Sequence, residues 1–246
     1  MDKKIRVTVW NENLDEYRHP DTLKRYPGGL HCFIPEYLNK EPDIIARGVT
    51  FQDDDFGVPD SVLDDTDVMV LYSHMAQDMV SDERAEAVVN RIANRGMGLI
   101  LLHSAISMKV VRRLLGPGSF TGYREVGEKE RVWVTKPAHP IAEGLPPYFE
   151  FPQSEVYLEP GSFAREDDLI FISWYQGGAA ARTGMTWQHG DGKIFWFSPG
   201  HLTFDIMNTE IHQKIILNAI RWAAPKFRVE YNRRTGDTPA LELLNL

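Results

Sequence analysis

The stretch Gly98-Leu99-Ile100-Leu101-Leu102-His103-Ser104 decides the fold that is predicted for this chain. Residues 97–102 are apolar without alternation, which is typical of a central parallel strand that is covered on both faces. Residues 107–115 then carry apolar side chains at helical spacing, so the strand is expected to lead through a polar pair into a helix. Ligands bind outside the carboxyl ends of strands in open α/β sheets. By its position alone, His103 is therefore a hypothesis for a functional residue.

Composition narrows the class of protein. The 246-residue chain carries a formal charge of −8, with 43% hydrophobic and 25% charged residues, which is typical of a globular protein. Because nucleic acids and anionic membranes select basic surfaces, neither is expected as the main partner. The single cysteine excludes an internal disulfide and suits a reducing compartment. With no apolar signal region and no apolar run of about 20 residues, the chain is expected to be cytoplasmic.

Strands and helices alternate on both sides of the central stretch. Ser81 is predicted to cap a helix, and the Asp191-Gly192 step predicts a hairpin. This rhythm favours βαβ units and a mostly parallel sheet. The further predicted strands are residues 5–10, 48–52, 67–72, 169–174, 185–188 and 194–197, and the further predicted helices are residues 30–38 and 211–223.

Residues 116–160 depart from this rhythm. They are rich in charged and turn-forming residues and lack a core-sized apolar set, so we interpret them as a loop region inserted over the carboxyl edge of the sheet. A single α/β domain is expected over residues 1–224. Residues 225–246 form a polar tail with an apolar end, which predicts packing on a neighbouring subunit and hence a homo-oligomer.

Residues that ligate metals or move protons follow four predicted strands. They are Glu12, His74, His103 and His201, and His31 opens the first helix on the same side. Because the carboxyl ends of parallel strands share one edge, these side chains are expected to meet. Neutral imidazoles with a carboxylate suit a divalent metal, zinc first, held by His31, His74, His103 and His201. Without a metal, histidine and glutamate provide general acid/base catalysis, and no local metal motif decides between the two.

Further candidates flank this edge. Glu125 and Glu155 bring carboxylates over the expected site, and Arg124 either orients a polar ligand or pairs with Glu125. Asn11 is a candidate for substrate binding, and Tyr26 and Trp174 either stack on a sugar face or pack in the core. His189 and His212 are predicted to be surface residues. A nucleotide cofactor is not expected, because no Gly-x-Gly-x-x-Gly follows the first strand.

Several motifs along the chain together resemble those of one protein family. They include Val9-Trp10-Asn11-Glu12, Tyr26-Pro27-Gly28-Gly29-Leu30-His31, residues 96–104, His139-Pro140-Ile141, Pro199-Gly200-His201 and residues 218–224. On these residues the sequence resembles the ThuA family of trehalose-utilisation proteins nearly throughout, to about Pro225. The resemblance implies a flavodoxin-like three-layer sandwich, similar to the class I glutamine amidotransferases. It also implies a role in disaccharide catabolism through 3-keto sugars, beside a separate NAD-dependent dehydrogenase.

One departure from the amidotransferases shapes the functional expectation. Their cysteine nucleophile follows the central strand and a histidine follows the last strand, whereas these positions are His103 and His201 here, so glutaminase activity is not expected. The leading hypothesis is an enzyme that processes a keto sugar or disaccharide as a lyase, isomerase or hydrolase. In it the histidines hold a metal or shuttle protons, and the carboxylates act as acid, base or orienting groups.

Two alternatives from other classes stay open. The first is a non-catalytic accessory or sugar-binding subunit that keeps the amidotransferase-like fold, because fold alone does not determine function. The second, more distant, is a serine hydrolase that uses Ser104. Residues 102–106 lack the glycines of a nucleophile elbow, which weakens this last hypothesis.

Overall fold

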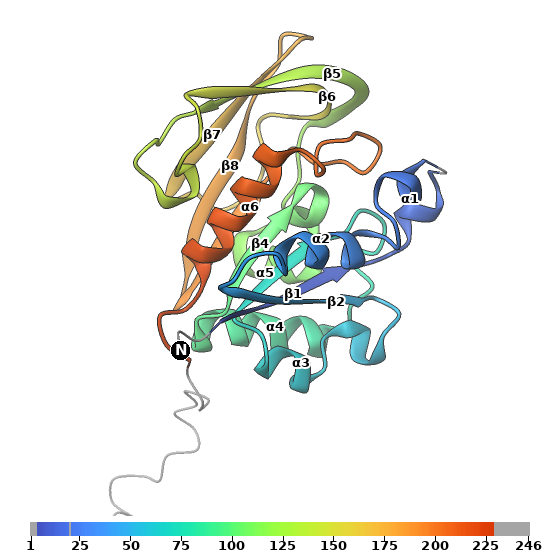
Figure 1. Cartoon of the computed structure of the whole chain (residues 1–246), viewed down its shortest axis with the longest axis vertical. Coiled ribbons are helices and arrows are strands. Elements are labelled where there is room, and N and C mark those ends of the chain that lie inside the picture. The colour runs from blue at the N-terminus through green and yellow to red at the C-terminus, as the bar shows by residue number, and fades with distance from the viewer. Residues whose placement is uncertain (1–3, 20, 229–246) are drawn as a thin grey trace, which may run out of the picture.

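The computed structural model describes residues 4–19 and 21–228. A single nine-stranded sheet has the order β2-β1-β3-β4-β9-β8-β7-β5-β6. In Figure 1 the long strands β5 to β8 rise above the helices that flank the other half of the sheet. Among the described residues, no helix is long and apolar enough to cross a bilayer.

Five strands form the parallel half of the sheet. They are β1 (Ile5–Asn11), β2 (Ile44–Thr50), β3 (Val68–Tyr72), β4 (Gly98–Leu102) and β9 (Gly192–Phe197). The register aligns Asn11 with Tyr72, Tyr72 with Leu102, and Leu102 with Phe197. The carboxyl ends of these four strands therefore form one edge, and the residues that follow them are neighbours in space.

Helices cover both faces of the parallel half, as the unbroken apolar run of β4 predicts. Leu102 and Ile100 face one core, which α2 (Leu30–Leu38) and α6 (Glu210–Ala223) cover. Leu99 and Leu101 face the other core. That face is covered by α3 (Asp60–Asp64), α4 (Asp82–Arg95) and α5 (Lys109–Leu115). A four-residue helix, α1 (Thr22–Arg25), lies in the segment between β1 and α2.

The prediction of a mostly parallel sheet is wrong. Four of the eight described pairings are parallel and four are antiparallel. The antiparallel half adds β8 (Ala180–His189), β7 (Asp168–Tyr175), β5 (Gly122–Val134) and β6 (Tyr148–Leu158) beyond β9. Parallel neighbours need a long crossover, usually a helix, and between β5 and β9 the only helical turn is Pro140–Ala142. Direct connections without a crossover helix join β5 to β6, β7 to β8 and β8 to β9 as antiparallel neighbours, while β6 and β7 run in the same direction on opposite sides of β5.

Residues 116–160 do not form the loop region that we expected over the edge. They supply β5 and β6, the last two strands at the antiparallel end of the sheet. The alternation of β5 is present, because Glu128, Glu130 and Val132 are buried while Lys129 and Arg131 are exposed. It is hidden in the sequence because two of the three buried positions carry glutamate rather than an apolar residue.

Several local predictions are confirmed. Ser81 caps α4 by accepting a hydrogen bond from the Arg84 amide at 3.2 Å. The Asp191-Gly192 turn joins β8 and β9 as an antiparallel hairpin, with His189 opposite Gly192. We predict an interface for residues 225–246, but the part of this tail beyond position 228 lies outside the described residues.

Gly48 fixes how closely β2 approaches α2. A methyl group at this position would lie 1.8 Å from the backbone carbonyl oxygen of His31. Because this contact is with backbone, relief requires the helix to move. We expect Gly48→Ala to lower the free energy of unfolding by about 3 kcal/mol, measured by urea denaturation. Gly122→Ala is the matched control, since its nearest atom is a Leu158 side chain at 3.4 Å, and equal losses in the two variants would contradict this account.

His212 is buried, so its predicted surface position is wrong. It lies on α6 at 1% exposure, with its ring 5.5 Å from that of Phe197, and burial lowers its pKa to about 3. The unfolded chain therefore binds a proton below about pH 6.5 that the folded chain does not, and stability falls as the pH falls.

The pH dependence of unfolding tests this burial. Between pH 7 and pH 4.5 we expect the wild type to lose about 2–3 kcal/mol more unfolding free energy than His212→Gln, measured in urea. His189→Gln, at the half-exposed turn end of β8, serves as the control and is expected to follow the wild type. Identical pH profiles for the wild type and His212→Gln would show that His212 ionises freely in the folded chain.

Candidate metal centre

Three histidines from three neighbouring strands meet at the carboxyl edge of the parallel half. His74, His103 and His201 follow β3, β4 and β9, and one ring nitrogen of each lies within 4.8 Å of the others. His201 lies edge-on to the other two rings, at centroid distances of 4.9 Å from His74 and 5.1 Å from His103. His103 and His201 are buried and His74 is half-buried. This spacing is compatible with three ligands around one ion.

His103 occupies a sharp turn between β4 and a short 3-10 helix (His103–Ser107). Its φ angle of +50° is uncommon for a residue with a side chain. The indole of Trp196 donates to the His103 carbonyl at 2.7 Å and so supports this backbone. An elbow therefore exists here although the sequence lacks glycines around it, and it presents His103 rather than Ser104. Such strained positions cluster at functional sites.

The hydrogen bonds fix the tautomers of two histidines. His103 Nδ1 lies 2.7 Å from the Ser198 carbonyl, which can only accept, so Nδ1 carries the proton. The Ser104 hydroxyl donates to the Ser73 carbonyl at 2.7 Å, so the 3.2 Å contact with His74 requires His74 Nδ1 to donate. Both rings therefore keep an unprotonated Nε2 when neutral. Metal-binding histidines are oriented in this way, with the second nitrogen donating to a fixed acceptor.

His201 is connected to Glu125 through a threonine. Its Nδ1 lies 2.7 Å from the Thr203 hydroxyl, which donates to Glu125 at 2.9 Å. Burial, followed by the proximity of His103 and His74, lowers the pKa of His201 to about 2. The ring is therefore neutral at physiological pH, which suits a metal ligand. Glu125 reaches His201 from β5 rather than from the expected loop.

Glu155 and Tyr157 project from β6 onto His103. The Glu155 carboxylate and the Tyr157 hydroxyl each lie 2.8 Å from His103 Nε2. Because His103 Nδ1–H is committed to Ser198, the short contact with Glu155 needs a second proton, carried by the imidazole or by the carboxyl group. Glu155 also lies 3.9 Å from His201 Nε2. The His103–Glu155 pair thus holds one proton that can be transferred.

Glu12 supports the turn that carries His74. Its carboxylate accepts from the Ser73 hydroxyl at 2.6 Å and from the Met75 and Ala76 amides at 2.8 and 2.6 Å. These partners surround His74 in the chain, so the structure gives Glu12 a positioning contact, whereas a catalytic role was predicted. Asn11, the candidate beside it, donates to the buried Glu16 carboxylate.

The other predicted site residues lie outside the histidine cluster. His31 is on the first turn of α2, beyond the group of described residues with ligand spacing, and burial lowers its pKa. Tyr26 is buried and donates to the Phe204 carbonyl at 3.1 Å. Arg124 pairs with Glu128, at 2.5 and 3.0 Å, rather than with Glu125. Trp174 is 61% exposed and lies beside Lys129, Arg131 and Glu150 on β5 and β6.

Three residues near the cluster were not predicted. Tyr157 shares the face of Glu155 at strand spacing, a signal that was present in the sequence, and burial raises its pKa well above the usual value. Asp15 and His19 come from the polar segment after β1, which has no periodicity. Asp15 is buried, which raises its pKa, and lies 3.8 Å from His19, whose ring is 6.4 Å from that of His201.

Fold and site together define a mixed α/β sandwich with a buried histidine cluster at the seam between its parallel and antiparallel halves. Residues 6–223 match the sequence profile of the ThuA family, which is described as trehalose utilisation. The chain therefore belongs to the ThuA family, as its motifs predict. No curated protein sequence matches it.

Solved structures share the fold at low sequence identity. A putative ThuA-like protein from Parabacteroides merdae superposes with a TM-score of 0.65 at 15% identity, over 92% of this chain and 93% of that one. A cytoplasmic protein of Salmonella typhimurium reaches 0.56 at 17% identity, over 90% and 100% of the two chains. A putative GMP synthase subunit from Thermoplasma acidophilum reaches 0.50 at 14% identity, over 90% and 94%. These likenesses show a common fold.

Proposed function

We propose that this member of the ThuA family is a cytoplasmic enzyme that acts on a keto sugar or disaccharide at a divalent metal held by the histidine cluster, with zinc as the first expectation. ThuA membership supports a role in carbohydrate utilisation at the level of the family. The observation that carries the proposal is the fixed tautomers of His74 and His103, which leave both Nε2 atoms unprotonated beside His201. Three neutral imidazoles suit zinc, with an open position for a substrate oxygen.

The donor set fits such an ion without a change of fold. Two of the three rings already donate through Nδ1 to fixed acceptors, and His201 has the Thr203–Glu125 chain at its Nδ1. When bound, the metal would act as a Lewis acid on a sugar carbonyl or hydroxyl oxygen. Tyr157 and Glu155 contact the same imidazole, so both border the position that a substrate oxygen would take.

Proton transfer is assigned to Glu155, because the metal would occupy the His103 nitrogen that Glu155 contacts. A carbanion or alkoxide formed beside a sugar carbonyl needs a base to remove a proton and an acid to return it. Glu155 is almost fully buried and lies beside the His103 nitrogen that would hold the metal, so its carboxyl group can do both within one site. A lyase, an isomerase and a hydrolase would each use such a proton transfer. Identifying the product determines which of the three reactions takes place.

The non-catalytic alternative keeps the same site for a different purpose. An accessory or sugar-binding subunit would bind a sugar at the cluster without turning it over.

The serine hydrolase alternative is disfavoured, because Ser104 donates its proton to Ser73 and receives a hydrogen bond from His74. A nucleophilic serine needs a base that accepts its proton.

Partners follow from the same proposal. The substrate is a small-molecule sugar, and no nucleotide cofactor is needed in this chain. A separate NAD-dependent dehydrogenase would supply the keto sugar, and the chain is proposed to form a homo-oligomer. Analytical ultracentrifugation of the full chain tests the last point.

Turnover of a keto disaccharide tests the function. The purified protein is incubated with 3-keto-trehalose, and its disappearance and product are followed by NMR before and after chelation. Loss of turnover on chelation with recovery on added zinc supports the enzyme. Metal and sugar binding without turnover would favour the accessory subunit.

A further inference from the structure

A second group of polar side chains converges over Gly29, at the start of α2. Asn13 follows β1, Glu16 lies in the 3-10 helix Asp15–Tyr17, and His31 is on the first turn of α2. A Cβ atom at this glycine would lie 2.9 Å from Asn13 Oδ1, 3.2 Å from His31 Nδ1 and 3.3 Å from Glu16 Oε1. The three side chains therefore gather around one point. We call Asn13, Glu16 and His31 the Gly29 cluster.

Each member of the Gly29 cluster has a buried atom without a hydrogen-bond partner among the described residues. These atoms are Asn13 Oδ1, Glu16 Oε2 and His31 Nδ1. Glu16 is 0% exposed, and its other oxygen accepts from the Asn11 side-chain amide and from the Leu30 backbone amide. Capping of α2 thus accounts for only one of its two oxygens. Because buried polar atoms are nearly always paired with protein, water or an ion, the cluster is suited to a further group.

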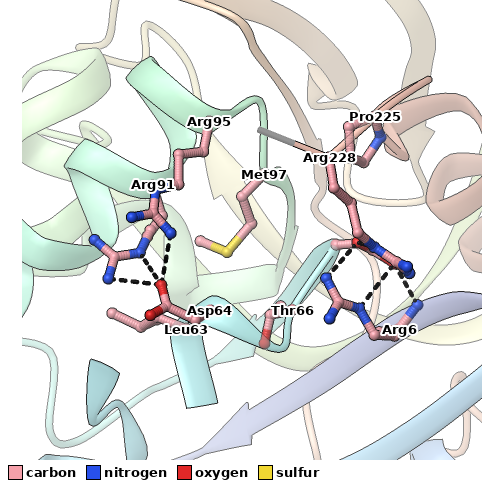
Figure 2. Close-up of a pocket in the computed structure, with 10 residues that line it drawn as sticks. Arg6, Leu63, Asp64, Thr66, Arg91, Arg95, Met97, Pro225 and Arg228 are labelled. Carbon is pink, nitrogen blue, oxygen red and sulfur yellow. Dashed lines mark hydrogen bonds and ion pairs between the residues drawn. The ribbon is translucent and has the colours of Figure 1, made fainter. Parts of the chain in front are cut away.

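The carboxylate of the Gly29 cluster has no matching cation. Glu16 makes no ion pair within the described part of the chain. By contrast, the buried Asp67 at the opposite edge of the sheet pairs with Arg6 and Arg228, which Figure 2 shows. Burial lowers the pKa of His31, and both charges that act on its ring come from carboxylates. Because a buried carboxylate without a cation is costly, the cluster favours a positively charged ligand.

We propose that the Gly29 cluster binds a divalent metal ion that takes both oxygen and nitrogen ligands, represented by Mn²⁺. Glu16 and Asn13 offer oxygens, which suit Mn²⁺, and the imidazole of His31 disfavours Mg²⁺ and Ca²⁺, which take oxygen ligands. A water molecule donates only two hydrogen bonds and leaves the Glu16 charge unmatched, whereas a cation contacts all three acceptors. The ion would hold the segment after β1 against α2, and it does not depend on a metal at the histidine cluster.

Electron paramagnetic resonance of the full chain titrated with Mn²⁺ tests the proposal, because the sharp signal of the free ion disappears on binding. We expect the wild type to bind Mn²⁺ at this site and to unfold at a higher temperature in its presence. His31→Gln and Glu16→Gln should each weaken this binding about tenfold or more. His103→Ala, or His74→Ala if the first does not fold, disrupts the histidine cluster and should retain the site with a Kd within about twofold. His189→Gln, at the half-exposed turn end of β8, is the matched control for His31→Gln.

Binding that persists in His103→Ala and is lost in His31→Gln supports the site even if the histidine cluster proves to hold no metal. No Mn²⁺ binding by either the wild type or His103→Ala excludes the site. Loss in His103→Ala with full affinity in His31→Gln would assign the ion to the histidine cluster, which supports the proposed function and overturns this site. Equal loss in His189→Gln and His31→Gln would show binding to the general surface. Thermal unfolding of each variant without metal separates lost binding from lost fold.

Discussion

Glu155→Gln is expected to lower kcat for a 3-keto disaccharide about 10²- to 10⁴-fold, the range that a positioned general acid or base contributes. The amide keeps the shape of the carboxylate, which lies 2.8 Å from His103, but it cannot take up and return a proton. Because the change conserves volume, we expect the unfolding temperature and the metal content to stay close to those of the wild type. Steady-state kinetics followed by NMR, together with elemental analysis, give the three readouts.

Glu150→Gln is the matched control for Glu155→Gln. Glu150 lies on the same strand, β6, but on the exposed side, where it pairs with Lys129 and Arg131. Glu150→Gln should leave kcat unchanged. A loss of kcat in Glu150→Gln as large as that in Glu155→Gln would mean that removing charge from β6, rather than proton transfer, explains the effect. Unchanged turnover in Glu155→Gln would remove Glu155 from the mechanism.

His103→Ala is expected to abolish metal binding. Removing a group that hydrogen-bonds to a metal ligand typically weakens metal binding about 10- to 100-fold. Removing the ligand itself should weaken metal binding further. In the untagged wild-type protein, elemental analysis is expected to find close to one divalent ion per chain. In His103→Ala that ion should be lost. Thr203→Val removes only the hydroxyl that orients His201, so it should retain metal with about tenfold lower affinity.

His189→Ala provides the comparison for His103→Ala. This histidine lies at the end of β8, away from the cluster, and should keep the full metal content. Metal that persists in His103→Ala and is lost from His189→Ala would place the ion elsewhere. The absence of metal from the wild type as well would return the three histidines to acid/base or structural roles, and it would raise the accessory subunit to equal standing with the enzyme.

The parallel half of the fold could be predicted because its sequence follows simple periodicity. The unbroken run at 97–102 becomes β4, buried on both faces, and the apolar spacing of residues 30–38 becomes α2 over the same bounds. Strand ends in parallel register share an edge, so the meeting of His74, His103 and His201 follows from the sequence alone. Glu125 and Glu155 are predicted near the site on another ground, a loop over the sheet edge, and they contact the site from the strands β5 and β6 instead.

The remaining features of the fold and of the site depend on interactions that the local sequence does not reveal. The buried face of β5 carries Glu128 and Glu130, so its pattern suggests a solvated loop. Glu128 is satisfied by Arg124 and the Gly177 amide, a partnership that only the folded chain displays. His31 fails to join the cluster because its position on α2 is set by the approach of the helix to Gly48, not by a strand end. The burial of His212 depends likewise on Phe197, a residue of another element.

The seam position of the histidine cluster has a consequence for the order in which the chain acquires its contacts. His74 and His103 come from neighbouring parallel strands, but Glu155 and Ser198 stand 52 and 95 residues from His103 along the chain. Contacts of such separation carry a large loop-closure entropy and form slowly. We therefore expect the cluster to be completed late, after the helices and local hairpins. A metal ion that binds only the finished geometry would bind a chain that has already folded, so it would lengthen the lifetime of the native state more than it would speed folding.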